Sequence, residues 1–149
     1  MVKKIENLYS TLTNDFKIKK PKIIIAGINP HAGENNTISK DDNKYLLPII
    51  NKLKSKEIYI NGPNSGDGII NNENLKKFDA FVFTFHDQAL IPFKILSNYE
   101  GVNFTSNLDI IRVSPSHGTA ENLVGSNKVI SKGIINCFNL IKKIYKNRN

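Results

Sequence analysis

Three histidines stand in polar turn sequence that follows apolar, β-branched runs of the kind that form buried strands. His31 follows residues 22–27 (KIIIAG), His86 follows residues 80–85 (AFVFTF), and His117 comes shortly after another short strand-like run. Ligands of open α/β sheets bind at the carboxyl ends of the strands. If these strands are parallel neighbours, the imidazoles converge on one crevice. The competing interpretation of each histidine is a solvated or locally hydrogen-bonded loop side chain.

The chemistry that converging imidazoles suit is the binding of zinc, cobalt or a similar ion. Asp87 beside His86 and Glu34 near His31 are candidates to orient the second ring nitrogen of each histidine. Two histidines do not complete a catalytic zinc site, which usually has three protein ligands and an open position. The sequence contains no GxGxxG or Walker phosphate loop, and no local signature of a Ser/His/Asp or Cys/His arrangement.

The composition is that of an ordinary globular chain, with 149 residues, 40% of them hydrophobic and 23% charged. The formal net charge is +8. The lysines are scattered, however, which favours a solvated surface attractive to an anionic substrate over a nucleic-acid site. Arginine occurs only as Arg112 and Arg148, so the interior Arg112 is informative. Cys137, the one cysteine, lies in an apolar helical stretch and is expected to be a buried, inert thiol.

The periodicity of apolar residues predicts alternating helices and strands. Expected in the first part are a helix over about 3–16, a strand over 22–27, a helix from Ser39 to about Lys54, a strand over 57–60, a loop over 61–68 and a helix over about 72–77. Ser39 and Asp42 resemble a capping box, and Pro48 is expected to kink the helix behind it. These alternations favour an α/β fold.

The second part of the chain continues the pattern. Strands are expected over 80–85, 101–105 and 110–113, and a helix over 118–124. Ser126 can cap a last helix, whose apolar positions repeat at helical spacing: Ile130, Ile134, Phe138, Ile141 and Tyr145. No breaker-rich linker divides the chain, which predicts one α/β domain over residues 1–149 with a mixed or largely parallel sheet. No apolar run could span a bilayer and no signal sequence is found, so we expect a cytoplasmic protein without membrane contact.

Five short motifs together resemble the 4-hydroxythreonine-4-phosphate dehydrogenase family of pyridoxal phosphate (vitamin B6) synthesis. In chain order they are residues 29–34 (NPHAGE), 61–63 (NGP), 86–88 (HDQ), 101–103 (GVN) and 117–120 (HGTA). The resemblance runs from about residue 5 to the C-terminus and corresponds to the C-terminal half of the family's subunit. It implies an isocitrate/isopropylmalate dehydrogenase-like fold, here one truncated α/β/α domain, and a homodimer with sites near the interface.

The resemblance also implies a reaction and a set of site residues. The reaction is oxidation of 4-phosphooxy-L-threonine by NAD or NADP, assisted by a divalent metal (Zn, Mg or Co), followed by decarboxylation. The family's metal ligands correspond to His31 and His86. Its substrate contacts correspond to Lys94, Asn103 and Arg112, where the cations can hold phosphate or carboxylate. Its adenine-side cofactor loop corresponds to His117, Gly118, Thr119 and Ala120.

Three departures from the family pattern limit what is expected of the chain alone. The family's third metal histidine and a further His-Thr substrate contact belong to a segment that this chain does not cover, and Ser116 replaces the usual Asp before the HGTA motif. We therefore expect weak or no activity without a second copy or a complementing N-terminal polypeptide, and an exposed apolar patch where that polypeptide packs. The alternatives are a non-catalytic dinucleotide- or metal-binding fragment, one subunit of a split dehydrogenase for a related phosphorylated hydroxy acid, and a basic nucleic-acid binder.

Overall fold

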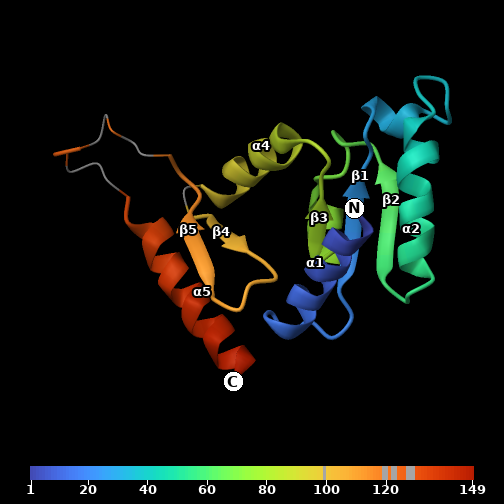
Figure 1. The fold of residues 1–149 in the computed structure, drawn as a ribbon. Coiled ribbons are helices and arrows are strands. Elements are labelled where there is room, and N and C mark those ends of the chain that lie inside the picture. The colour runs from blue at the N-terminus through green and yellow to red at the C-terminus, as the bar shows by residue number, and fades with distance from the viewer. Residues whose placement is uncertain (99, 119–120, 122–123, 127–129) are drawn as a thin grey trace.

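Helices and strands alternate in the computed structural model, which describes residues 1–98, 100–118, 121, 124–126 and 130–149 (Figure 1). Residues 1–82, the sheet region, contain α1 (Val2–Asn14), β1 (Lys22–Ala26), the 3-10 helix η1 (Pro30–Gly33), the π-helix η2 (Asp42–Leu46), α2 (Leu47–Lys54), β2 (Tyr59–Asn64), α3 (Asn72–Lys77) and β3 (Ala80–Val82). Helix α4 (His86–Ser97) leads into residues 100–149, the hairpin region, with β4 (Val102–Thr105), β5 (Arg112–Pro115) and α5 (Lys132–Arg148).

Strand β1 is the centre of a parallel sheet with the order β2-β1-β3. All its residues except Lys22 are buried, as expected for an isoleucine run covered on both faces. Ile23 and Ile25 join the core that includes residues of α1 and α2, and Ile24 and Ala26 face a smaller core on the other side. The carboxyl end of β1, which His31 follows, is therefore held by side chains packed on both faces of the strand. The expected α/β fold with a parallel sheet is confirmed.

Several boundaries differ from the sequence prediction. Strand β2 extends to Asn64 through residues predicted to be a loop, and β3 ends at Val82 rather than at residue 85. The last helix begins at Lys132, with Ser131 rather than Ser126 at its N-cap position. The helix expected over 118–124 lies partly outside the described residues. Among the described residues, no helix combines the length and apolarity that crossing a membrane requires.

The helix that was expected behind Ser39 forms, but its start differs. Residues Asp42–Leu46 are a π-helix and the α-helix begins at Leu47, with Pro48 in its first turn. Proline has no N–H to donate to the preceding turn, so this local widening takes the place of the expected kink. The capping box is wrong: the Ser39 hydroxyl accepts the N–H of Asp41 at 3.2 Å, and the Asp42 carboxylate bonds elsewhere.

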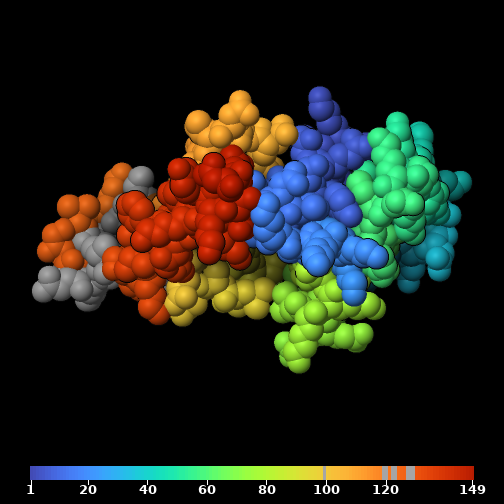
Figure 2. Space-filling model, turned by 90° about the horizontal axis from the view of Figure 1, so that it is seen from below, coloured from blue at the N-terminus to red at the C-terminus, as the bar shows by residue number. Residues whose placement is uncertain are grey.

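Strands β4 and β5 form a separate antiparallel pair, packed against α5 (Figure 1). In its register Asn103 lies opposite Ser114 and Thr105 opposite Arg112. Because side chains alternate along a strand, these four residues share one face of the hairpin. Figure 2 shows the C-terminal end of α5 against the segment that follows α1, which is where the two regions join.

Helix α5 buries one face and exposes another. Gly133, Cys137 and Ile144 are buried, and burial raises the pKa of the Cys137 thiol, as expected of an inert cysteine. By contrast, apolar residues that repeat at helical spacing in the sequence lie on the exposed side, with Phe138 61% and Tyr145 66% accessible. Helix α4 likewise exposes apolar side chains, namely Ile91, Ile95 and Leu96. Apolar surface of this kind is typical of a face that another polypeptide covers.

Candidate functional site

The loop after β1 holds His31 in an uncommon backbone conformation. Every residue from His31 to Asn36 has a positive φ, with values of 52° at His31, 52° at Ala32, 78° at Gly33, 44° at Glu34, 52° at Asn35 and 72° at Asn36. Left-handed backbone is unfavourable for side chains other than glycine and persists only where the surroundings fix it. The exposed imidazole of His31 is therefore carried by a strained segment that needs an anchor.

Asp42 is that anchor. Its carboxylate is 1% exposed and accepts the backbone N–H of Ile28 at 2.7 Å and that of Asn29 at 3.1 Å. The Asn29 side-chain amide donates a third bond at 3.2 Å. The hydrogen bonds of a charged group each stabilise by about 1.5–3 kcal/mol. Asp42 thus fixes the start of the His31 loop and acts on His31 as a positioning residue.

Two glycines of the same loop leave room for this arrangement. A Cβ added to Gly27 would lie 2.8 Å from Asp42 Oδ1, and one added to Gly33 would lie 2.4 Å from the Ser39 carbonyl oxygen. Neither position accepts a side chain without movement of the backbone or of Asp42. Sequence reasoning assigned Asp42 to a capping box and missed this role, because its bonds to Ile28 and Asn29 span 14 and 13 positions and leave no local pattern.

His86 is the first residue of α4 and follows the segment after β3. Its Nδ1 lies 2.8 Å from Asp87 Oδ1, and the side chains of both residues are largely exposed. Asp87 therefore lies where it can orient the His86 ring through Nδ1, and its role toward a metal ligand stays a prediction. Since β1 and β3 are parallel neighbours, His31 and His86 follow adjacent carboxyl ends at one edge of the sheet.

Two neighbouring clefts lie at this edge. The His31 cleft, of about 710 Å³, is also lined by Asp67, Asp87 and Gln88. The His86 cleft, of about 850 Å³, lies between the two regions and is lined mainly by apolar side chains, with Asn103 among its polar ones. Ile70 and Pro92 line both clefts. The structure thus brings His31 and Asp87 to one cleft, and His86 and Asn103 to the next.

Within the described part of the chain, the set of possible metal ligands is incomplete. No group of three or more histidine, cysteine, aspartate or glutamate residues there could hold a metal ion. Two imidazoles are suitable donors, but they fall short of the three protein ligands of a catalytic zinc site. Asp67 adds negative charge beside His31: the hydroxyl of Ser65 and, less strongly, His31 lower the pKa of this exposed carboxyl.

The third histidine does not join the other two at the sheet edge. His117 follows β5, which lies outside the parallel sheet, so the condition for convergence is not met. It lies instead with Lys94 and Gly118 in a cleft of about 470 Å³, the Lys94 cleft. The structure therefore brings a predicted substrate cation next to the predicted cofactor loop. Thr119 and Ala120, also predicted for that loop, lie outside the described residues.

Asn103 and Arg112 share one face of the β4–β5 hairpin, as the register requires. The Arg112 guanidinium donates from Nη1 to the Thr105 hydroxyl at 2.9 Å, and Arg112 is exposed. This bond fixes the direction of the side chain at the turn end of the hairpin. The predicted substrate residues are thus divided among Asn103 in the His86 cleft, Lys94 in its own cleft and Arg112 on the hairpin.

The α/β fold with a parallel sheet is that of a dehydrogenase-like protein, and solved structures agree with it. The chain resembles a 4-hydroxythreonine-4-phosphate dehydrogenase from Klebsiella pneumoniae with a TM-score of 0.77 and 29% identity, over 97% of this chain and 43% of that one. A protein of the same name from Burkholderia phymatum gives a TM-score of 0.74 and 31% identity, over 96% and 43%. A terephthalate 1,2-cis-dihydrodiol dehydrogenase from Burkholderia xenovorans, 24% identical with a TM-score of 0.67, shares the fold.

Sequence comparison identifies the family. The model described as "Pyridoxal phosphate biosynthetic protein PdxA" matches residues 1–141, and the chain belongs to this family. A 4-hydroxythreonine-4-phosphate dehydrogenase of Prosthecochloris aestuarii is 33% identical over 142 residues, which are 95% of this chain and 42% of that protein. One of Zymomonas mobilis is 43% identical over 117 residues, 78% and 35% respectively. The chain thus spans about two fifths of the length of such relatives.

Proposed function

We propose that this chain supplies part of the active site of an NAD(P)-dependent, divalent-metal-assisted dehydrogenase acting on 4-phosphooxy-L-threonine. The observation that carries the proposal is the placement of His31 and His86 after adjacent carboxyl ends of the sheet, with Asn103 lining the His86 cleft. The family match supports the substrate class, because the relatives are named for this reaction. In the proposed reaction the secondary alcohol gives a hydride to the nicotinamide and a proton to a base, and the resulting keto acid loses carbon dioxide.

Each residue has a stated role in this proposal. Lys94 and Arg112 hold the anionic ends of the substrate, and Arg112 can do so with two parallel bonds. Asn103 directs the substrate by a single hydrogen bond. His117 and Gly118, with Thr119 and Ala120, contact the dinucleotide. His31 and His86 provide two metal ligands, and a bound metal would polarise the hydroxyl and stabilise the negative charge that develops as carbon dioxide leaves.

The proposal requires a second polypeptide surface, because the third metal ligand is missing from the described residues. The exposed side chains of Phe138 and Ile95 support this requirement, since such side chains are buried when a partner surface covers them. We assign the covering surface to polypeptide equivalent to the part of the relatives that this chain does not span, whether continuous with it or separate. A second copy of the chain is the other candidate, with the homodimer expected from the resemblance.

Turnover with metal, NAD and 4-phosphooxy-L-threonine tests the function. The 149-residue chain is assayed alone and with the remaining N-terminal part of a relative, such as the Prosthecochloris aestuarii protein. We expect negligible turnover alone and turnover in the mixture. Arg112→Gln should abolish the restored activity, whereas Lys132→Gln, a charge removal on exposed α5 surface, should leave it unchanged. Full activity of the isolated chain would contradict the need for a covering polypeptide.

Cobalt binding tests the metal ligands independently of turnover. Absorption of Co²⁺ in the visible range is measured for the mixture and for three variants. His31→Asn and His86→Asn should each weaken Co²⁺ binding by about 10–100-fold, the effect usual for loss of a ligand or its orienting partner. His117→Asn, a matched removal of the histidine that lies outside the sheet edge, should not change it. Equal binding by all three variants would leave a non-catalytic dinucleotide-binding fragment as the better interpretation.

A further inference from the structure

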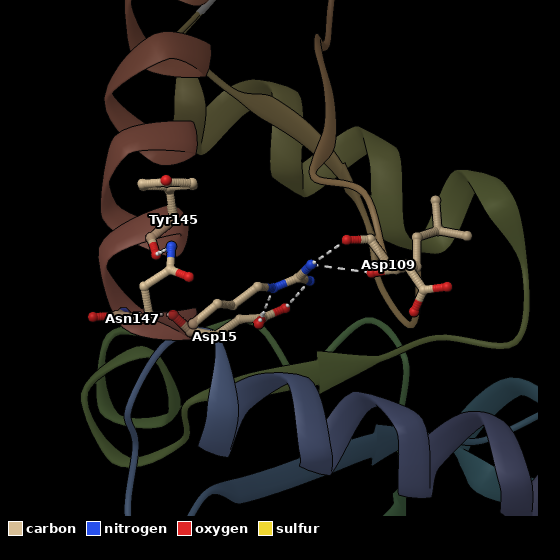
Figure 3. Close-up of polar contacts among 7 residues, drawn as sticks. Asp15, Asp109, Tyr145 and Asn147 are labelled. Carbon is tan, nitrogen blue, oxygen red and sulfur yellow. Dashed lines mark hydrogen bonds and ion pairs between the residues drawn. The ribbon is translucent and has the colours of Figure 1, made fainter.

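Among the residues that the structure describes, a cluster of short polar contacts joins the sheet region to the hairpin region. Asp15 ends α1, and its carboxylate is bound by the guanidinium of Arg148 from the last turn of α5, with both bonds at 2.8 Å (Figure 3). The Asn147 amide donates to the Asp15 carbonyl oxygen at 2.6 Å. Asp15 is 5% exposed, so this ion pair is much less accessible to water than an ordinary surface pair.

The same guanidinium also holds the hairpin. Arg148 Nη1 donates to the carbonyl oxygen of Leu108 at 3.1 Å and to that of Asp109 at 3.3 Å (Figure 3). Both carbonyls belong to the turn between β4 and β5, directly beyond the pair of Thr105 and Arg112. One planar group therefore bonds to the end of α1 and to the hairpin turn at once. A lysine ammonium cannot reproduce these directions, because it lacks the fixed fork of donors.

Two further contacts lie at the same junction, an aromatic pair and a cation–π contact. The rings of Phe16 and Phe104 meet edge to face at 5.8 Å between centroids, and the Lys143 ammonium lies 5.8 Å from the centre of the Phe16 ring. On the far side of the junction the two regions are separated by the His86 cleft. The bonds between Arg148 and Asp15 thus hold the two regions together at this junction.

We propose that Asp15 and Arg148 are positioning residues that fix the β4–β5 hairpin, and so the Arg112 guanidinium, relative to the histidine-bearing edge of the parallel sheet. The part of this statement that concerns substrate rests on the proposed function, in which Arg112 holds a phosphate or carboxylate. The composition agrees with it: arginine occurs at two positions in a chain whose other basic residues are lysines. One of the two is predicted to bind substrate, and the other holds the hairpin that carries it.

The scarcity of arginine makes the test direct. In the ¹⁵N-labelled 149-residue chain, guanidinium Nε–H signals arise from Arg112 and Arg148 alone. Inorganic phosphate is titrated into the wild type, Arg148→Lys, Asp15→Asn and the control Lys132→Gln, while amide exchange is followed in residues 102–105 and 112–114. Lys132 pairs with Glu100 on exposed surface of the hairpin region, so its removal takes one charge from α5 without touching the junction.

In the wild type we expect phosphate to move the Arg112 signal. Arg148→Lys and Asp15→Asn should weaken phosphate binding by about tenfold, since small misplacements of binding groups have large effects. They should also speed amide exchange in the hairpin by about tenfold, while thermal unfolding stays cooperative. Lys132→Gln should change neither. Phosphate affinity and hairpin exchange that stay at wild-type values in Arg148→Lys would show that charge alone suffices and would overturn the proposal.

Two outcomes separate this proposal from the proposed function. If phosphate fails to move the Arg112 signal of the wild type, the anion-binding role of Arg112 fails, while faster hairpin exchange in Arg148→Lys still supports the positioning role. If Arg148→Lys does not fold, Asp15→Asn decides, because it keeps the size of the side chain and one acceptor oxygen. Hairpin exchange and phosphate affinity unchanged in both variants would refute the positioning role.

Discussion

The sheet region and the hairpin region differ in how much of their apolar surface they bury for themselves. In the sheet region Ile23, Ile25 and Ile50 are each 0% exposed, and both faces of β1 are covered. In the hairpin region α5 buries Cys137 and Ile144 but leaves Phe138 61% exposed. The sheet region therefore specifies its own packing. The hairpin region has an exposed apolar face on α5, and polar contacts at the junction hold it against the sheet region.

The largest difference in the free energy of unfolding is expected between two Ile→Ala variants, one in each region. Ile25→Ala should lower the free energy of unfolding by about 2–5 kcal/mol, because it opens a cavity in a packed core. Ile134→Ala on the exposed side of α5 should change it by less than about 0.5 kcal/mol. Urea denaturation followed by circular dichroism measures both. Similar losses in the two variants would mean that the face of α5 is already covered in solution.

The next largest loss of stability is expected when the Asp42 carboxylate, which binds the start of the His31 loop, is removed. Asp42→Ala should destabilise the chain by about 2–3 kcal/mol, because two backbone N–H groups and an amide lose a charged acceptor. Asp42→Asn should recover only part of this, since its NH₂ group faces donors. The neighbouring Asp41→Asn serves as the matched control and should be nearly neutral. The same denaturation measurement decides, and a neutral Asp42→Ala would remove the assigned positioning role.

A third comparison of stability is between Gly33, in the loop after β1, and Gly118, in the segment after β5. Gly33→Ala should lower stability by at least about 1–2 kcal/mol, the usual cost of left-handed backbone for an L-residue, because φ is +78° there and Ser39 blocks the added Cβ. Gly118 has nothing within 4 Å of an added Cβ, so Gly118→Ala should leave the melting temperature within about one degree. A large loss at Gly118 would show that its loop is packed in solution.

The smallest effect concerns the single thiol. Burial raises the pKa of Cys137, so its thiolate fraction, and its rate of reaction with a thiol reagent near pH 8, should be below those of an unfolded chain. Because the folded state holds this proton more tightly, stability should begin to fall as the pH rises above about 8.5, the ordinary thiol pKa. Rates equal to those of the unfolded chain would show that α5 opens readily from the hairpin.

Much of the sheet region could be predicted because its signals are local. The isoleucine run of β1, the amphipathic α1 and the turn residues around α3 each determine their own element, and all three form at the predicted places. Strand β2 was predicted too short, since Gly62 and Pro63 read as a turn. Strand β2 is an edge strand of the sheet, where a proline without an N–H is tolerated.

The site was less predictable, because its geometry depends on contacts between distant positions. Periodicity marks Phe138 and Tyr145 as apolar, but it does not say what covers them. The pairing of β4 with β5 removes His117 from the edge that holds His31 and His86, and no spacing rule foresees this. The hydrogen bonds of Asp42 to the His31 loop and the ion pair of Arg148 with Asp15 likewise join distant positions, and only the folded structure shows them.

The run of left-handed residues from His31 to Asn36 has a consequence for recognition. Its backbone freedom is removed when the chain folds and Asp42 binds the start of the loop, before any ligand arrives. A ligand that fits His31 as it stands loses little conformational entropy on binding, and one that requires the loop to rearrange must first break those buried bonds. Selectivity at this end of the sheet therefore comes from shape that is set in advance rather than from adaptation.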